Sequence, residues 1–166
     1  MQDRLQLAIE LARRAGGLLL EGQGTSLHVS KKGATDLVTD YDLKSERMLV
    51  KGIRSAYPDD AILAEEGTSS DSGYTEHLWL IDPLDGTTNY AHGVPFYSVS
   101  IGLMANERLL FGVVYDPNRD ELFHASEGGG AWRLMSCCCF SSASCSSATT
   151  GGSHRGRSRS STTRRS

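Results

Sequence analysis

Two stretches of the chain repeat apolar residues every three or four positions, which is typical of helices with one buried face. The first predicts a helix over residues 3–21 that begins at Asp3, and we interpret it as a packing helix. The second predicts a helix over residues 41–56, which Tyr57-Pro58 ends. The apolar positions are Leu5, Ala8, Ile9, Ala12, Ala15 and Leu19 in the first stretch and Leu43, Met48, Leu49 and Ile53 in the second.

Short apolar or β-forming runs follow these helices and predict strands. The runs over 97–125 are separated only by short turns, so they predict an antiparallel meander. Residues 30–35 are interpreted as a loop. The predicted strands cover residues 61–64, 78–81, 97–104, 109–115 and 121–125.

The strand predicted over 78–81 runs into two aspartates, Asp82 and Asp85. Pro83 between them has a fixed φ and no N–H, so the loop is stiff. Residues 86–88 then offer backbone N–H groups and two hydroxyls. Carboxylates bind hard cations such as Mg²⁺, and N–H groups at the start of a helix bind phosphate. The segment therefore carries the groups for a metal-assisted phosphate site.

The same segment has a plainer interpretation as an ordinary turn. Asp85-Gly86 is a common hairpin dipeptide, and Asp82-Pro83 is a common way to open a loop. A hairpin requires a second strand directly after Gly86, however, and residues 87–93 show no alternation of apolar and polar positions. The bare motif leaves both interpretations open.

Acidic residues also gather upstream of this segment. Three of them lie within residues 36–42 at the start of the second predicted helix, where acids suit the first turn and Thr39 or Asp40 can cap it. Glu65 and Glu66 follow the strand predicted over 61–64. Paired glutamates at a strand end are usually solvent-exposed, so both groups are also consistent with a solvated surface.

Charge and composition divide the 166-residue chain into residues 1–134 and a low-complexity tail over 135–166. Five of the 17 basic residues and none of the 20 acidic residues lie in the tail, so residues 1–134 carry a net charge of −8. An acidic body argues against a nucleic-acid groove and agrees with cation binding.

The tail lacks hydrophobic periodicity and cannot bury enough apolar surface to offset the entropy of ordering. It holds all four cysteines, at 137–139 and 145, without zinc or redox spacing. We expect it to be disordered. Its Arg-Gly and Arg-Ser repeats allow RNA binding, but a frameshifted or mis-spliced end is the favoured interpretation. The chain shows no signal peptide and no membrane span, which favours the cytoplasm.

The residues from Trp79 to Phe96 follow the order Trp-Leu-Ile-Asp-Pro-Leu-Asp-Gly-Thr-Thr-Asn-Tyr-Ala-His-Gly-Val-Pro-Phe. This order resembles the first signature of the inositol monophosphatase family. The resemblance extends from about Leu5 to Trp132, and residues 128–132 resemble a glycine-rich turn of the family. It implies an α+β arrangement, the N-terminal portion of a layered α/β/α/β/α fold, with two helices packed on a largely antiparallel sheet.

The resemblance also implies Mg²⁺-dependent hydrolysis of a phosphate monoester. The implied metal ligands are Glu65, Asp82, Asp85 and the carbonyl of Leu84. The implied catalytic group comprises Thr87, which would be hydrogen-bonded toward Asp42 and would orient a water, and Glu66 beside the metal ligands. The implied phosphate-binding N–H groups are those of Gly86, Thr87 and Thr88. Lys31 or Lys32 matches a basic loop that approaches the site.

A full-length member of the family would continue for about as many residues again and would carry a second signature, Trp-Asp-x-Ala-x-Gly. Neither Trp79 nor Trp132 is followed by aspartate, so we expect one metal ligand and most substrate contacts to be missing. Inositol monophosphate is the expected substrate, and histidinol phosphate and nucleotide bisphosphates stay open. We also expect exposed apolar surface, a homodimer and impaired activity. The alternative is an inactive remnant that acts through subunit or RNA binding.

Overall fold

The computed structural model of the chain describes residues 2–23, 29–31, 37–67 and 75–135. Lys32, Asp36 and the tail from residue 136 onward lie outside these ranges. Our predictions about the basic loop, disorder of the tail and RNA binding by the tail therefore stay predictions.

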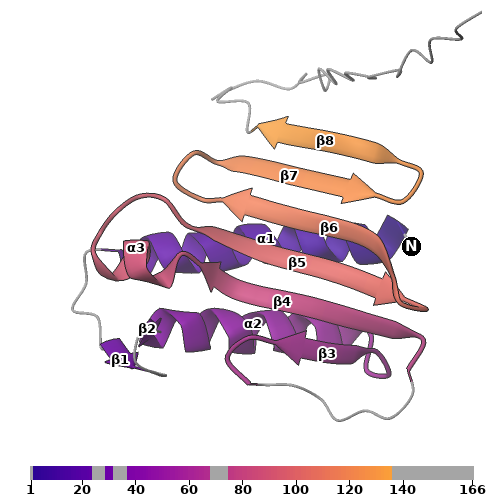
Figure 1. Cartoon of the computed structure of the whole chain (residues 1–166), viewed down its shortest axis with the longest axis horizontal. Helices are drawn as coiled ribbons and strands as arrows, with labels where there is room; N and C mark the ends of the chain where they lie inside the picture. Colours follow the sequence, from indigo (N-terminus) through magenta and orange to yellow (C-terminus); the bar gives the residue numbers. More distant parts are fainter. Residues whose placement is uncertain (1, 24–28, 32–36, 68–74, 136–166) are drawn as a thin grey trace, which may run out of the picture.

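A six-stranded sheet forms the body of the described part of the chain (Figure 1). Its first two strands run parallel, and all other neighbours run antiparallel, which confirms the predicted largely antiparallel sheet. In spatial order the strands are β3 (Ala61–Ala64), β4 (His77–Asp85), β5 (Ser98–Ala105), β6 (Arg108–Asp116), β7 (Glu121–Ser126) and β8 (Gly130–Met135).

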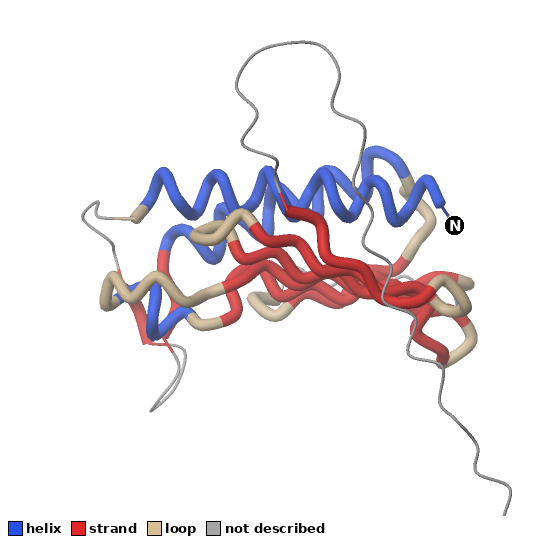
Figure 2. Tube along the Cα trace, turned by 90° about the horizontal axis from the view of Figure 1, so that it is seen from above, coloured by secondary structure: helices blue, strands red, loops and turns tan. Residues whose placement is uncertain are grey.

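The long helices α1 (Gln2–Gly22) and α2 (Asp40–Ala56) cover the same face of this sheet (Figure 2). Their predicted apolar faces pack on alternate residues of the strands, because successive side chains of a strand point to opposite faces. The resulting core includes Trp79, Ile101 and Phe111, which are at most 2% exposed. None of the described helices is long and apolar enough to cross a membrane.

No helix of the described residues covers the opposite face of the sheet, which is partly apolar and is called the uncovered face below. Leu63, Val114 and Phe123 are 52%, 41% and 42% exposed. Strand register places Val114 and Phe123 in one row across β6 and β7, on the face away from the helices. The expectation of exposed apolar surface is therefore confirmed for the described residues.

The structure corrects two predicted element ends. β4 does not stop at Ile81 but continues to Asp85. Residues 130–135, of which 130–132 belong to the predicted turn, pair with β7 as β8. The sequence signal failed because Pro83 interrupts the alternation in β4, and because β8 starts at the last of three consecutive glycines, residues 128–130.

Three further short elements were missed or left open by the sequence. Val29–Lys31 (β1) and Leu37–Thr39 (β2) pair antiparallel at the ends of the segment interpreted as a loop. Thr87–Ala91 forms the short helix α3, so the hairpin interpretation of Asp85-Gly86 is wrong.

Asp60, just before β3, is a buried carboxylate that joins the start of α1 to the start of β4. It accepts hydrogen bonds from Arg4 Nε and Nη2 at 3.0 and 3.1 Å and from Trp79 Nε1 at 2.9 Å. The guanidinium of Arg4 lies 4.1 Å from the centre of the Tyr57 ring. This cluster lies at the end of the β3–β4 pair opposite Glu65 and Asp85.

We expect the Asp60 carboxylate to make stability depend on pH. Burial raises its pKa, but hydrogen bonds from Arg4 and Trp79 and the charge of Arg4 outweigh burial, so the net pKa lies below its ordinary value. A lowered pKa stabilises the fold above the unfolded-state pKa of about 4, and this stabilisation is lost as the pH falls through the folded-state value. Urea denaturation between pH 7 and pH 3 should show the stability difference between the natural chain and Asp60→Asn constant at high pH and shrinking below about pH 4. A difference that grows on acidification would contradict this assignment.

Candidate metal and phosphate site

A β-bulge at the end of β4 brings Asp82 and Asp85 to the same face of the sheet. In a regular strand, residues three apart point to opposite faces. Here Asp82 pairs with Ser100 and Asp85 pairs with Ser98, so three steps along β4 oppose two steps along β5. The extra residue in the bulge reverses the alternation. Both aspartates therefore lie on the uncovered face, away from the helices.

The parallel pairing of β3 with β4 brings Glu65 beside Asp82. Ala64 lies opposite Ile81, and the backbone N–H of Glu65 donates to Ile81 O at 3.2 Å. The next residues along the chain are Glu65, just after β3, and Asp82 in β4, and their side chains form a hydrogen bond. Glu65 and Asp82 also line a hollow of about 630 Å³, together with residues that include Leu63, Leu80 and Val114.

The environment of Asp82 raises its pKa from the ordinary value to about 7. Burial is the largest cause, followed by the hydrogen bond with Glu65 and the negative charges of Glu65 and Asp85. The N–H of Leu84, which donates to Asp82 Oδ1 at 3.1 Å, lowers the pKa and only partly offsets these effects. Asp82 therefore lies where positive charge, from a proton or a cation, is favourable.

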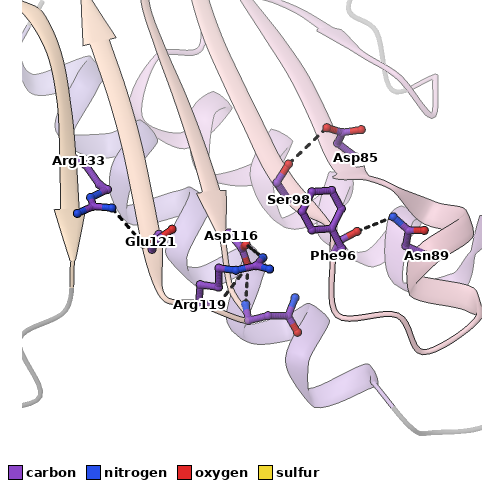
Figure 3. A network of polar contacts seen from close by, with 9 residues as sticks. Asp85, Asn89, Phe96, Ser98, Asp116, Arg119, Glu121 and Arg133 are labelled. Carbon is purple, nitrogen blue, oxygen red and sulfur yellow. Dashed lines mark hydrogen bonds and ion pairs between the residues drawn. The ribbon is translucent and has the colours of Figure 1, made fainter.

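Asp85, like Glu65, is more exposed than Asp82. It is exposed, and its Oδ2 accepts from Ser98 Oγ at 3.4 Å (Figure 3). Its charge acts on Asp82, but no group of three or more His, Cys, Asp or Glu side chains in the described part of the chain is arranged as a complete cation site. The structure thus joins Glu65 to Asp82 directly and places Asp85 beside them on the same face.

A sharp turn at Gly86 leads from β4 into α3. Gly86 has φ 93° and ψ 34°, in the left-handed region, and a Cβ there would lie 3.1 Å from Phe96 O. Asn89 Nδ2 donates to the same Phe96 O at 2.8 Å (Figure 3). This hydrogen bond connects α3 to the end of the loop that leads to β5. The N–H groups in the first turn of a helix have no partners within that helix. Gly86, Thr87 and Thr88 occupy this turn, next to the acids.

Thr87 connects the predicted phosphate-binding turn to Asp42 and to the carbonyl of Leu84, a predicted metal ligand. Its hydroxyl lies 2.9 Å from Asp42 Oδ1 and 3.0 Å from Leu84 O, and either oxygen can accept its single proton. Asp42 is 1% exposed, and its Oδ2 also accepts from the N–H of Thr39 at 2.8 Å. Asp42 therefore closes the cap of α2, with Thr39 as the predicted cap residue, and orients Thr87 at the same time.

Two buried side chains that the sequence did not single out also contact the segments of the site. Ser45 Oγ donates to Pro83 O at 3.1 Å, and Glu46 Oε2 accepts from the N–H of Glu66 at 2.7 Å. The side chain of Glu66 is half-buried. In the sequence, Ser45 and Glu46 resemble ordinary polar positions of a helix; only their place one turn after Asp42 could have drawn attention to them.

The groups present fit a hard divalent cation. Mg²⁺ prefers oxygen ligands, and the uncovered face offers the carboxylates of Glu65, Asp82 and Asp85. Leu84 O lies 3.0 Å from Thr87 Oγ1 and, with two lone pairs, keeps at least one for a cation. Burial, and after it the hydrogen bond with Glu65 and the charges of Glu65 and Asp85, raise the pKa of Asp82, and a bound cation would offset these effects.

Comparisons with known proteins identify the family of this chain. The model of the inositol monophosphatase family matches residues 1–165. Inositol monophosphatase 2 of Solanum lycopersicum is 41% identical over 136 residues, which are 80% of this chain and 51% of the tomato protein. The fructose-1,6-bisphosphatase/inositol-1-monophosphatase of Thermotoga maritima is 42% identical over 131 residues, which are 78% of this chain and 50% of that protein.

Solved structures show the same fold. The crystal structure of the extragenic suppressor protein suhB from Bartonella henselae superposes with a TM-score of 0.76 and 37% sequence identity, covering 79% of this chain and 52% of that one. The chain thus spans about half the length of the relatives that it matches. The family is described as one of phosphatases, and both of these curated relatives are named as phosphatases. The chain belongs to the inositol monophosphatase family.

Proposed function

We propose that this chain carries the metal- and phosphate-binding part of a Mg²⁺-dependent phosphomonoesterase whose substrate is inositol monophosphate. The observation that supports it most is the convergence of Glu65 and Asp82 on one face of the sheet, beside the Thr87–Asp42 hydrogen bond. Histidinol phosphate and nucleotide bisphosphates are the alternative substrates, and the relative from Thermotoga maritima is also named for fructose 1,6-bisphosphate.

Glu65, Asp82, Asp85 and the carbonyl of Leu84 would hold Mg²⁺. When bound, the ion supplies a positive charge that lowers the pKa of a coordinated water and neutralises charge developing on the phosphate. Each acid would contribute an oxygen without a proton, so cation binding would displace a proton held by Asp82, whose pKa is raised to about 7.

The chain's own hydroxyl and amide groups then orient the reacting groups. Thr87 Oγ1 donates its proton to Asp42, which leaves its lone pairs directed away from Asp42 and able to accept a hydrogen bond from the attacking water. The N–H groups of Gly86, Thr87 and Thr88 would donate to the phosphate oxygens, where negative charge increases. Glu66, which follows Glu65 after the end of β3, would contribute to catalysis from beside the metal ligands.

Phosphate release from inositol 1-phosphate with Mg²⁺ tests this proposal, and Thr87 offers a matched pair of variants. Thr87→Ala should lower kcat by about a hundredfold, since a positioned group that handles a proton contributes at least that much. Thr87→Ser keeps the hydroxyl and should retain most of the activity. Equal activity of the alanine and serine variants would contradict the role of the hydroxyl.

Parallel assays with histidinol phosphate and a nucleotide bisphosphate decide the substrate. A chain that binds a divalent cation but releases phosphate from none of these substrates would favour the alternative, an inactive remnant that acts by binding a partner.

A further inference from the structure

The cap and the first two turns of α2 bury a row of polar side chains between the helix and the sheet. Thr39, Asp42, Ser45 and Glu46 are all at most 1% exposed, whereas the later inward positions of the same helix are apolar, at Leu49, Val50 and Ile53. A buried polar group destabilises a protein unless it has hydrogen-bond partners. A helix that only needed to pack on the sheet would continue its apolar face through these positions, so the row requires an explanation beyond packing.

Two members of this row contact the backbone beside the candidate metal ligands. Ser45 Oγ donates to Pro83 O at 3.1 Å, inside the bulge that separates Asp82 from Asp85. Glu46 Oε2 accepts from the N–H of Glu66 at 2.7 Å, one residue after Glu65. One helix therefore contacts both strand ends that carry the acids, and its buried position keeps these contacts rigid.

Such contacts are useful because the acids repel one another once they are ionised, as cation binding requires. The carboxylates of Glu65, Asp82 and Asp85 would move apart in the absence of a cation if only their own strands held them. A cation site binds tightly when its ligands are already in place, and groups that orient ligands affect metal affinity without touching the metal.

We infer that Ser45 and Glu46 are positioning residues, which hold the bulge of β4 and the end of β3 so that Glu65, Asp82 and Asp85 meet a divalent cation. This inference rests on the proposed function, because it takes these three acids as ligands. Glu46 itself lies under the sheet and contacts the backbone of Glu66, so its role is in the placement of Glu65 and not in coordination.

Titration of the full chain with Mn²⁺, followed by electron paramagnetic resonance, tests the inference without any assay of activity. Glu46→Ala should weaken Mn²⁺ binding by about 10- to 100-fold, the usual effect of removing a group that orients a metal ligand. Glu46→Gln keeps an acceptor oxygen for the Glu66 N–H and should restore most of the affinity. Ser45→Ala, a smaller change that is expected to fold in any case, should weaken binding about tenfold.

Two controls separate the possible outcomes. Ile53→Ala removes a buried apolar side chain two turns along α2 and should lower the melting temperature while the Mn²⁺ affinity stays unchanged. Asp82→Asn removes a proposed ligand and should weaken binding more than any variant of α2. If Asp82→Asn weakens binding but Glu46→Ala and Ser45→Ala do not, the positioning role is wrong and the proposed metal site stands. If Asp82→Asn has no effect, the proposed site itself is wrong. Equal weakening by Glu46→Gln and Glu46→Ala would also overturn the positioning role.

Discussion

Asp82→Asn is expected to weaken Mn²⁺ binding by this chain about a thousandfold. A pair of unit charges about 4 Å apart at an effective dielectric constant of about 20 interacts by about 4 kcal/mol, which is about three decades of affinity. Asp82 is the acid whose pKa is raised to about 7 by burial and by its acidic neighbours, so its negative charge lies where a cation gains most. Isothermal titration calorimetry or electron paramagnetic resonance measures the change directly.

Asp59→Asn is the matched control for this prediction. Asp59 is exposed and precedes β3, at the end of the strand opposite Glu65. The substitution changes the net charge by the same amount but leaves the candidate ligands in place, so the affinity should change by less than about twofold, as screened surface charges predict. Equal loss in both variants would mean that Mn²⁺ responds to overall charge and not to a site.

Trp79→Ala is expected to lower the free energy of unfolding by about 3–5 kcal/mol, the usual cost of truncating a buried aromatic side chain. Trp79 is fully buried beneath the helices. Its ring packs on Tyr57 and Phe111 with centroids 6.2 and 5.8 Å away, and its N–H donates to Asp60. Truncation leaves a cavity and removes one of the hydrogen bonds that Asp60 accepts. Since small domains are stable by about 5–15 kcal/mol, this variant should populate the unfolded state at low urea concentrations.

Trp132→Ala provides the comparison within the same sheet. Trp132 lies on the edge strand β8, is 36% exposed and donates only to Gly129 O within its own turn, at 2.9 Å. Its truncation should cost about 1 kcal/mol or less, within the range of a single hydrogen bond at an exposed site. Circular dichroism during urea denaturation measures both variants without relying on tryptophan fluorescence. A larger loss for Trp132 than for Trp79 would contradict the assignment of the core.

The helices and most strands could be predicted from the sequence because their residues alternate or repeat with the period of the element. The apolar spacing from Leu5 to Leu19 led directly to α1, and the cap at Thr39 marked the start of α2. The bulge in β4 could not be predicted in this way. It depends on which residues of β5 lie opposite, and a pairing register between strands is not encoded in the pattern of one strand.

The candidate site shows the same division between local and long-range information. The acids and the Gly86 turn were visible locally as residue types that bind cations and phosphate. The contact between Glu65 and Asp82 was not visible locally, because it depends on the parallel pairing of β3 with β4. Ser45 and Glu46 were missed altogether, since a polar residue in a helix is usually exposed, and only the fold shows that these two are buried.

The proposed function requires that Glu65, Asp82 and Asp85 coordinate a shared divalent cation. Crystals of this chain grown with Mn²⁺, which scatters anomalously and resembles Mg²⁺ in its preference for oxygen, test the claim most directly. We expect an anomalous difference peak on the uncovered face of the sheet, about 2.1 Å from oxygen atoms of Glu65 and Asp82. The side chain of Asp85 should be turned from Ser98 toward the ion. A peak bound only elsewhere on the protein, or none at these acids in well-ordered crystals, would contradict the proposed function.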